Sequence, residues 1–475
     1  MRVLAVASEC FPLVKTGGLA DVVGALPRAL AGEGIAVTTL LPGYPAVLDA
    51  LCAVATIGEA GPRERLLAGR AAGLELVVLD APALFARPGN PYRGPDGDWP
   101  DNGLRFAALA RAAAMVATGA TALPRFDLLH AHDWQAGLAP AYLAFTPPPR
   151  LPSVLSVHNL AFQGQFGADL FPLLGLPPEA FSISGVEYYG GVGFLKAGLY
   201  FADRITTVSP TYAHEIATPE GGMGLDGLIR ARADRVSGIV NGIDTEVWSP
   251  DTDASLARRY GIGTLPFRAE NRAALEAEFG LAPGEGPLFA VVSRLTWQKG
   301  IDLLVAALPA LLAAGGRLAL LGSGDAALES AFLAAAEANR GRVGVRIGFD
   351  ETLSHRMFGG ADAILIPSRF EPCGLTQLCA LRYGAPPLVA RVGGLADTVV
   401  DANEAALAAG VATGLMVAPG SAEALAIGIR RAAALWRQRD AWARLQANGM
   451  AADVSWARSS ARYAALFRET RAPPP

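Results

Sequence analysis

Short apolar runs alternate with longer helix-like segments along the chain, and this alternation restricts the fold more than any other feature. Runs that suit strands occupy 3–7, 36–41, 74–79, 128–130, 153–157 and 205–208, and again 288–292, 317–321, 343–347, 363–366 and 388–390. Helix-like segments lie between them at 20–32, 102–118, 301–314, 326–339, 374–383 and 422–437. Strands separated by helices predict βαβ units and parallel sheets that helices cover on both faces.

The series of strands and helices restarts after a polar stretch at 248–272. We therefore expect an α/β protein of two doubly wound, Rossmann-like domains that face each other across a cleft, one over 1–245 and the other over 246–455. The remaining segment, 456–475, starts with one more amphipathic helical pattern. We expect this last helix to pack back on the first domain.

Composition and charge narrow the class of protein. With 52% hydrophobic and 18% charged residues among 475, extended disorder is excluded. A net charge of −4 argues against nucleic acid or an anionic membrane as the main partner. The uncharged run 405–422 contains Pro419 and several glycines, which favours helix–turn–strand over a membrane span. The apolar run before Ser8 is too short for a secretory signal, so we expect a cytoplasmic protein.

A glycine-rich turn follows the first predicted strand. Lys15 is followed closely by Gly17 and Gly18, just before a helix-like segment. Adjacent glycines leave backbone N–H groups open to a phosphate, and a lysine supplies the countercharge. The alternative is an ordinary glycine turn before a helix, with an exposed lysine.

The second half has a comparable turn after its own first strand. Arg294 and Lys299 lie in the segment that joins 288–292 to the next helix, and a guanidinium fork with a point charge suits a diphosphate. A pair of solvated surface cations is the alternative. The next strand ends in a glycine turn at 322–325, which by itself is weak evidence for a nucleotide site.

The segment 367–376 is the most specific part of the sequence. A strand ends there, a proline-containing turn carries Glu371, and Gly374 opens a helix whose N-terminal amides suit a phosphate or a ribose. A capping carboxylate at a helix start is the alternative. The turn at Gly393 and Gly394 after the next strand echoes the Gly17–Gly18 turn.

Histidines and an aspartate follow two neighbouring strands of the first domain. His130 and His132 would share one face of a strand, which allows a metal pair, but no carboxylate or cysteine set completes a ligand shell. Asp133 and His158 fit better as polar groups for a hydroxylated ligand.

Seven segments carry a family resemblance: KTGGLADVVGALP, HAHDWQAGLAPAYL, SVHNLAFQGQF, FLKAGLYFADRITTVSPTYAHEI, NGIDTEVWSP, SRLTWQKG and PSRFEPCGLTQLCALRYG. In this order, and over nearly the whole chain, they resemble the bacterial glycogen synthase and plant starch synthase family. The resemblance implies a GT-B glycosyltransferase that transfers glucose from ADP-glucose to the non-reducing end of an α-1,4-glucan, with retention and without a metal or other cofactor. Its partners would be ADP-glucose and a glycogen or malto-oligosaccharide acceptor.

The resemblance also implies roles for individual residues. Lys15 with the amides of Gly17 and Gly18 would hold the donor diphosphate, Arg294 and Lys299 would neutralise the leaving phosphates, and Glu371 would hold the glucosyl hydroxyls. Further positions are Asp133, His158 and Asn241 beside the transferred glucose, with the His158 carbonyl near the anomeric carbon; Cys373, Gly374, Leu375 and Thr376 along the sugar and phosphate pocket; Phe349 against adenine; and Asp21 and Tyr92 near the glucose or acceptor. The candidate catalytic residues are Glu371, His158, Asp133, Lys299 and Arg294.

The chain departs from family patterns at several positions. Many retaining GT-B enzymes carry a second glutamate eight positions after the first, where this chain has Cys379. Family members often have a threonine where this chain has Val392, and the resemblance implies that the loss of this hydroxyl removes a side-chain contact but leaves the backbone phosphate contacts of the Gly393–Gly394 turn intact. Lys196 matches the family but has no chemical role that the sequence predicts. We favour a front-face reaction, in which the leaving diphosphate takes the acceptor proton, over a covalent route through Glu371.

The sequence leaves three other functions open. The first is a related GT-B transferase that uses UDP-glucose or a small acceptor. The second is a metal-dependent transferase with a DxD motif at 251–253 or 96–98. The third is a two-lobed sugar-binding protein, a class that usually works outside the cytoplasm.

Overall fold

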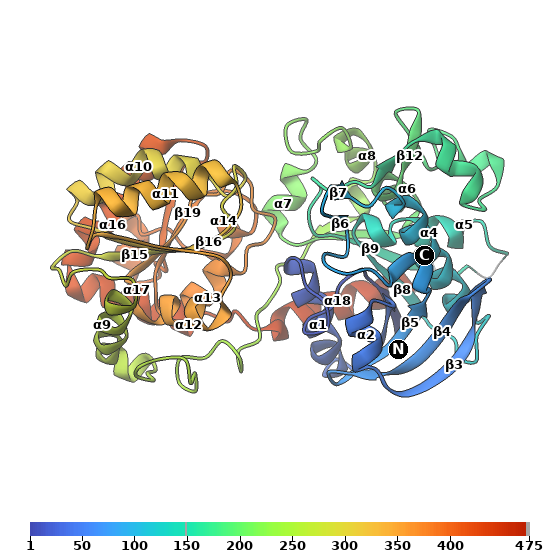
Figure 1. The fold of residues 1–475 in the computed structure, drawn as a ribbon, viewed down its shortest axis with the longest axis horizontal. Coiled ribbons are helices and arrows are strands. Elements are labelled where there is room, and N and C mark those ends of the chain that lie inside the picture. Colours follow the sequence, from blue (N-terminus) through green and yellow to red (C-terminus); the bar gives the residue numbers. More distant parts are fainter. Residues whose placement is uncertain (148–149, 472–475) are drawn as a thin grey trace. The chain divides into compact units, whose positions relative to one another are not determined.

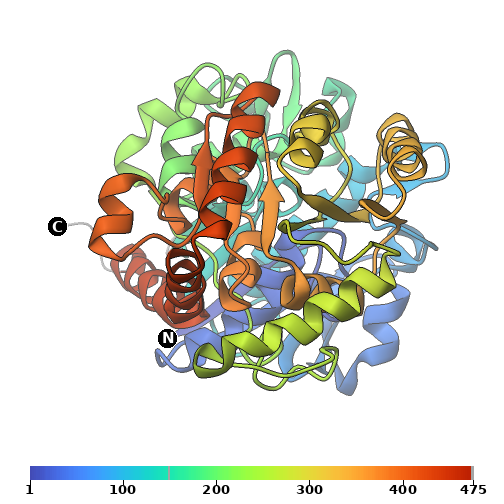
Figure 2. The ribbon, with the colours of Figure 1, turned by 90° about the vertical axis from the view of Figure 1, so that its left-hand side faces the viewer.

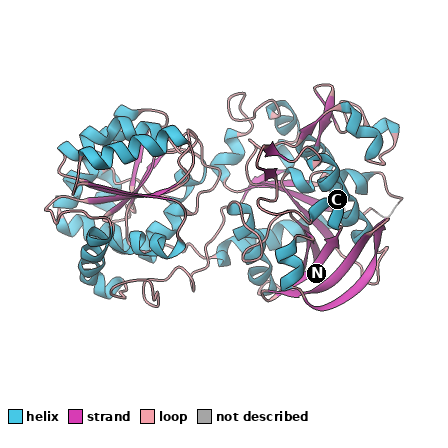
Figure 3. Cartoon of the chain, in the orientation of Figure 1, coloured by secondary structure: helices cyan, strands magenta, loops and turns pink. Residues whose placement is uncertain are grey.

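The computed structural model describes residues 1–147 and 150–471, which form two compact units (Figures 1 and 3). Unit 1 comprises Met1–Asn241 and Trp456–Pro475, and unit 2 comprises Gly242–Ser455. The chain therefore passes from unit 1 to unit 2 after Asn241, slightly before the expected boundary at 245. Within the described residues, no helix is both long enough and apolar enough to cross a membrane.

Unit 1 is built on a mostly parallel sheet. Its strand order is β14 (Val236–Gly238), β13 (Arg204–Thr207), β9 (Ser153–Val157), β8 (Leu128–His132), β1 (Arg2–Val6), β2 (Ala36–Pro42), β5 (Leu74–Asp80), β4 (Glu64–Ala71) and β3 (Cys52–Gly61). Neighbours from β14 to β5 are parallel, whereas β4 and β3 add an antiparallel edge. The chain goes from β1 to β2 on one side and later to β8 on the other. The strand order therefore reverses between β1 and β8.

Unit 2 has a parallel sheet of the same kind. Its order is β17 (Val343–Ile347), β16 (Arg317–Gly322), β15 (Leu288–Val292), β18 (Ala363–Ile366), β19 (Pro387–Ala390) and β20 (Leu415–Val417). All these neighbours are parallel. The order reverses between β15 and β18, and such a reversal is where open α/β sheets bind ligands, beyond the carboxyl ends of the strands.

Both faces of the unit 2 sheet are buried, because successive strand side chains enter different cores. Leu288 and Ala290 pack in one core, and Phe289 and Val291 pack in the other. Helices α9 (Arg268–Glu278), α12 (Glu351–Gly360) and α13 (Thr376–Arg382) supply the first core, and α10 (Ile301–Ala313), α11 (Ala326–Ala338) and α16 (Ala422–Arg437) supply the second. Figure 2 gives a second view, with helices on either side of the strands of unit 2.

In unit 1, the last helix, α18 (Trp456–Arg471), packs against α1 (Gly18–Ala31) and the sheet. Tyr463 and Phe467 are fully buried in this core, together with Val3 of β1. The Arg468 guanidinium donates a 2.7 Å hydrogen bond to the carbonyl of Glu33. Helix α18 is thus an integral part of unit 1.

The remaining elements connect these layers. In unit 1 they are α2 (Pro45–Ala50), α3 (Pro82–Phe85), β6 (Arg93–Gly94), β7 (Gly97–Asp98), α4 (Asn102–Ala117), α5 (Leu138–Ala144), β10 (Gln165–Phe166), β11 (Glu187–Tyr188), β12 (Gly191–Gly193), α6 (Phe194–Phe201), α7 (Pro210–Glu215) and α8 (Asp226–Ala231), with short 3₁₀ turns at Trp134–Ala136, Ala168–Leu173, Pro178–Ala180 and Ala233–Arg235. In unit 2 they are a 3₁₀ turn at Ile262–Phe267, α14 (Gly393–Thr398), α15 (Glu404–Ala409) and α17 (Arg439–Ala451). Helix α15 followed by β20 confirms the helix–turn–strand interpretation of 405–422.

Candidate functional site

In unit 2 the loop after β15 and the turn after β18 bring two oppositely charged side chains together. The Lys299 ammonium donates to Oε2 of Glu371 over 2.6 Å, and the Ser368 hydroxyl donates to the same oxygen over 2.9 Å. The Glu371 side chain is 8% exposed and that of Lys299 is 19% exposed. A cation and a carboxylate therefore lie within one hydrogen bond of each other at the reversal point of the sheet.

Arg369 ties the same two segments together. Its guanidinium makes two 2.7 Å hydrogen bonds to the carboxylate of Asp302, in the first turn of α10, and one of 2.7 Å to the carbonyl of Trp297. It also lies 4.5 Å from the centre of the Trp297 ring. The hydrogen bonds from Arg369 lower the pKa of Asp302. Arg369 thus holds the Lys299 loop against the Glu371 turn, a role that no local sequence pattern predicts.

The turn at Gly393 and Gly394 packs against the Glu371 turn and is hydrogen-bonded to it. The N–H of Gly394 donates to the carbonyls of Glu371 and Pro372, each over 3.1 Å. A Cβ atom at Gly393 would lie 2.0 Å from the Glu371 carbonyl oxygen, so no larger residue fits. A phosphate contact was expected from the backbone of this turn. The Gly394 amide instead donates to the backbone of the Glu371 turn.

A small cavity of roughly 40 Å³ lies beside the Lys299–Glu371 pair. Its lining residues are Val292, Ser293, Lys299, Ile301, Leu365, Ile366, Pro367, Ser368, Glu371, Gly374, Leu375, Thr376 and Gln377. Gln377 is fully buried and donates 2.9 Å hydrogen bonds to the carbonyls of Cys373 and Gly374. Its Oε1 is buried without a hydrogen-bond partner among residues 1–147 and 150–471. Gln377 was not among the predicted site residues, although it directly follows the segment 367–376.

The other predicted residues of unit 2 lie around this centre or on the surface. Cys373 is buried in the Glu371 turn, and Gly374 has a positive φ of 72°, which favours glycine. Arg294 is exposed in the Lys299 loop, and Phe349 is 79% exposed just before α12. Both side chains are therefore accessible to a ligand of unit 2.

In unit 1 the reversal point is occupied by Glu9, a buried carboxylate that the sequence analysis did not single out. One of its oxygens accepts hydrogen bonds from the hydroxyls of Thr16, over 2.5 Å, and Tyr92. The other accepts from the backbone N–H groups of Thr16 and Gly17, the latter over 3.3 Å. The Gly17 amide, expected on a diphosphate, is therefore bonded to Glu9 in this structure.

Three predicted residues surround Glu9 and the start of α1. The hydroxyl of Tyr92 also lies 2.7 Å from that of Ser8, and burial together with the Glu9 carboxylate raises the pKa of Tyr92 well above its usual value. Lys15 and Asp21, predicted on the basis of the same motif, form a 2.7 Å ion pair. The Lys15 side chain is 36% exposed, so its ammonium can reach a ligand.

Asp133 directly follows β8, the strand adjacent to β1, and its backbone has an unusual φ of 53°. Oδ1 of Asp133 accepts a 2.6 Å hydrogen bond from the backbone N–H of His158, which follows β9. Burial raises the pKa of Asp133 to about 7 and lowers that of His158 to about 4. Asn241 is 6% exposed, and its Oδ1 has no hydrogen-bond partner in the described part of the chain. Buried polar atoms of this kind usually have a partner, so Oδ1 of Asn241 suits a ligand hydroxyl.

The ring nitrogens of His130 and His132 contact other side chains. Nε2 of His130 lies 2.7 Å from the hydroxyl of Ser156, and Nδ1 of His132 lies 2.9 Å from Nε2 of His158. Among the described residues, no group of three or more His, Cys, Asp or Glu side chains could hold a metal ion. In the segment 251–253, Asp253 accepts a 2.6 Å hydrogen bond from the Tyr383 hydroxyl and lies 2.7 Å from Nδ1 of His355, so it is part of a buried structural cluster.

Lys196, to which the sequence assigned no role, is a structural lysine. Its ammonium donates to the carbonyls of Ile183 and Gly185 over 2.5 Å and 2.6 Å, and it lies 5.5 Å from the centre of the Tyr200 ring. Burial lowers its pKa. Lys196 therefore fixes the loop at 183–185 to α6.

The chain has two Rossmann-like units, and each unit has charged side chains where its strand order reverses. This arrangement is that of GT-B glycosyltransferases, and comparisons with known proteins agree. The family description "Starch synthase catalytic domain" matches residues 2–231, and "Glycosyl transferases group 1" matches residues 275–447. The chain belongs to the glycogen synthase and starch synthase family, as its motifs predicted. The predicted fold class and enzyme class are thereby confirmed.

Individual relatives cover the whole chain. Glycogen synthase from Novosphingobium aromaticivorans is 59% identical, with 98% of each chain covered. Glycogen synthase from Rhodopseudomonas palustris is also 59% identical and covers 99% of this chain and 98% of its own. Among solved structures, the catalytic domain of starch synthase IV from Arabidopsis thaliana, bound to ADP and acarbose, has a TM-score of 0.88 at 30% identity, with 99% of each chain covered.

Proposed function

We propose that this chain uses ADP-glucose as its donor and extends the non-reducing end of glycogen or a malto-oligosaccharide by α-1,4 bonds, with retention. Full-length relatives named glycogen synthase and a similar structure that binds ADP and acarbose support this choice. The observation that carries it is the Lys299–Glu371 pair, because a cation suited to phosphate and a carboxylate suited to sugar hydroxyls lie 2.6 Å apart at the reversal point of unit 2. Cytoplasmic location stays a prediction of the sequence.

In unit 2, Lys299 and Arg294 bind the leaving diphosphate, and Glu371 accepts hydrogen bonds from glucosyl hydroxyls. Without a ligand, Glu371 holds Lys299 in place, and phosphate oxygens can share that ammonium because it has three donor hydrogens. Cys373, Gly374, Leu375 and Thr376 line the sugar and phosphate pocket in this proposal. The exposed ring of Phe349 stacks against adenine.

In unit 1, Lys15 supplies a further cation for the diphosphate. Gly18 is the better candidate for an amide contact, because the Gly17 N–H is bonded to Glu9 and must leave it to reach phosphate. Asp133, His158 and Asn241 border the transferred glucose, and the unpaired Oδ1 of Asn241 accepts from a hydroxyl. Asp21 and Tyr92 lie near the glucose or the acceptor in this assignment.

We favour the front-face route for retention. The bond from the anomeric carbon to the diphosphate oxygen breaks, the bond to the acceptor hydroxyl oxygen forms on the same face, and the acceptor proton passes to the departing diphosphate. Lys299 and Ser368 both hydrogen-bond Oε2 of Glu371, which draws negative charge from that carboxylate and makes it a weaker nucleophile for the covalent route. The enzyme then works by orienting the reactants and by stabilising charge on the leaving group.

The test is incorporation of labelled glucose into glycogen from ADP-glucose and, in parallel, from UDP-glucose, each with and without EDTA. We expect incorporation from ADP-glucose that EDTA does not reduce. A preference for UDP-glucose would overturn the proposed donor. Loss of activity in EDTA, restored by magnesium or manganese, would overturn the metal-free charge assignment to Lys299 and Arg294.

A further inference from the structure

Three histidines of unit 1 form a continuous buried row. The rings of His130 and His132, both on β8, lie 4.0 Å apart between their centres. Nδ1 of His132 is 2.9 Å from Nε2 of His158, and the two rings are stacked with centres 5.2 Å apart. The row thus leads from the interior of the sheet to the residue assigned to the transferred glucose.

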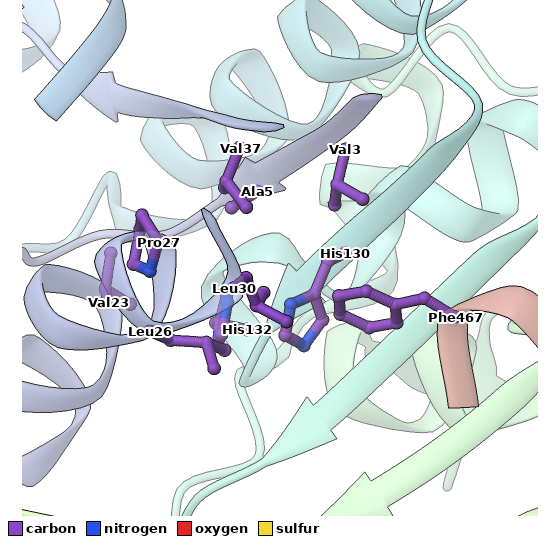
Figure 4. Close-up of a pocket in the computed structure, with 10 residues that line it drawn as sticks. All are labelled: Val3, Ala5, Val23, Leu26, Pro27, Leu30, Val37, His130, His132 and Phe467. Atoms are coloured by element: carbon purple, nitrogen blue, oxygen red, sulfur yellow. The ribbon is translucent and has the colours of Figure 1, made fainter. Parts of the chain in front are cut away.

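A small apolar cavity lies beside two members of this row (Figure 4). His130 and His132 border it together with apolar residues of β1, β2, α1 and α18: Val3, Ala5, Val23, Leu26, Pro27, Leu30, Val37 and Phe467. Its volume of roughly 10 Å³ is at the lower limit for a single water molecule. The Phe467 ring lies 5.1 Å from that of His130 and packs against the row from α18.

The surroundings of His132 determine where the protons of this row lie. Burial lowers the pKa of His132 well below its usual value and that of His158 to about 4, so both rings are neutral near pH 7 and each carries one N–H. An N–H is rarely buried without an acceptor, and apart from the two histidines the cavity lining offers only apolar side chains. The proton of His132 therefore belongs on Nδ1, where Nε2 of His158 accepts it.

We propose that His132 is a positioning residue for glucosyl transfer: it holds the His158 ring and keeps the His158 proton on Nδ1, the nitrogen that can donate to a sugar hydroxyl. The backbone of His158 is held separately, by Asp133 over 2.6 Å. Asp133 thus fixes the main chain of His158, and the preceding residue, His132, fixes its ring. This inference rests on the proposed function, which places His158 beside the transferred glucose.

Two substitutions separate the hydrogen bond from the packing. His132→Phe keeps a ring in the row and removes the donor, whereas His132→Asn keeps an N–H donor near the position of Nδ1. Phe467→Leu is the matched control, because it alters the same cavity without touching the bond to His158. We expect kcat to fall by about 10- to 100-fold in His132→Phe, a typical loss when the partner that orients an active histidine is removed. KM for ADP-glucose should change little, His132→Asn should recover part of kcat, and Phe467→Leu should retain wild-type kcat.

The decisive readout is the tautomer of His158 in the unmodified chain, from ¹⁵N chemical shifts of histidine-labelled protein. The chain has only five histidines, so assignment by single substitution is practical. We expect His158 protonated on Nδ1 at pH 7.5, and a mixture of tautomers in His132→Phe. Protonation of His158 on Nε2, or wild-type kcat in His132→Phe, would overturn the proposal. Absence of glucose transfer by the wild-type chain would instead overturn the proposed function, and the tautomer measurement needs no substrate.

Discussion

Glu371 and Lys299 are paired in the structure but are assigned to different parts of the donor. Separate replacement of the two residues should therefore affect ADP affinity and turnover differently. Lys299→Ala removes a charge-assisted contact to the leaving diphosphate, worth about 1.5–3 kcal/mol. At about 1.4 kcal/mol per decade, affinity for ADP should fall by about 10- to 150-fold. Turnover should fall by at least ~10²-fold, since the contact strengthens as the glucosyl bond breaks.

Glu371→Ala should lower turnover without weakening ADP binding. ADP alone has no glucosyl group, so the variant loses no contact with it. The substitution also frees the Lys299 ammonium from a carboxylate 2.6 Å away and removes a negative charge from the neighbourhood of the phosphates. ADP affinity should therefore stay unchanged or increase by up to about tenfold, which corresponds to ~1.4 kcal/mol. Turnover should fall by ~10²-fold or more because the sugar loses its orientation.

Calorimetric ADP titrations beside initial rates test both variants. Glu371→Gln keeps the size and the acceptor oxygen of the side chain, so it should show a smaller loss of turnover than Glu371→Ala. Glu278→Ala is the matched control, because Glu278 forms a 3.2 Å ion pair with Arg356 elsewhere in unit 2. It should change neither quantity. If Glu371→Ala weakens ADP binding as much as Lys299→Ala does, Glu371 belongs to the nucleotide site or to the fold, and the assignment is wrong.

Three further predictions follow from the geometry. Arg369→Lys loses the paired hydrogen bonds to Asp302, so we expect kcat to fall by about tenfold with little change in melting temperature; a wild-type kcat would show that Arg369 does not position Lys299. Asn241→Ala removes an unpaired buried oxygen, so stability should hold while KM for ADP-glucose rises by about tenfold, roughly one hydrogen bond; equal KM would remove Asn241 from the site. Burial raises the pKa of Asp133 to about 7, so between about pH 4 and 7 this carboxyl holds more protons in the folded than in the unfolded state and its contribution to stability falls as pH rises; in urea unfolding, the stability of Asp133→Asn relative to the wild type should therefore increase from pH 4 to 7, and a constant difference would refute it.

The main strands were predictable because they are continuous apolar runs that suit sheets buried on both faces. The predicted ranges 153–157, 288–292, 343–347 and 363–366 coincide with β9, β15, β17 and β18. Strands β3 and β4 were missed. β3 is rich in alanine and glycine and mostly exposed, and bulges interrupt its pairing with β4, so no two-residue period of apolar side chains marks it.

The predicted site residues are those that local motifs carry, and the missed ones act through contacts between distant segments. Glu9 is bonded to Tyr92, 83 positions away, and Arg369 to Asp302, 67 positions away. No local sequence pattern predicts contacts between residues so far apart in the chain. The same holds for Lys196, whose two carbonyl partners come from an irregular loop. Motif spacing indicated a phosphate role for the glycine turns, but only the folded backbone shows that the Gly17 and Gly394 amides are already bonded within the protein.

The most direct test of the account is to follow the products when the purified chain is mixed with ADP-glucose and maltotriose in EDTA, using proton NMR of the anomeric region together with ADP release. We predict maltotetraose with a new α-1,4 bond and one ADP for each glucose transferred. This outcome requires donor cleavage, retention and transfer to the acceptor hydroxyl in one reaction. A β-linked product, free glucose in place of a longer oligosaccharide, or ADP-glucose left intact would contradict the account.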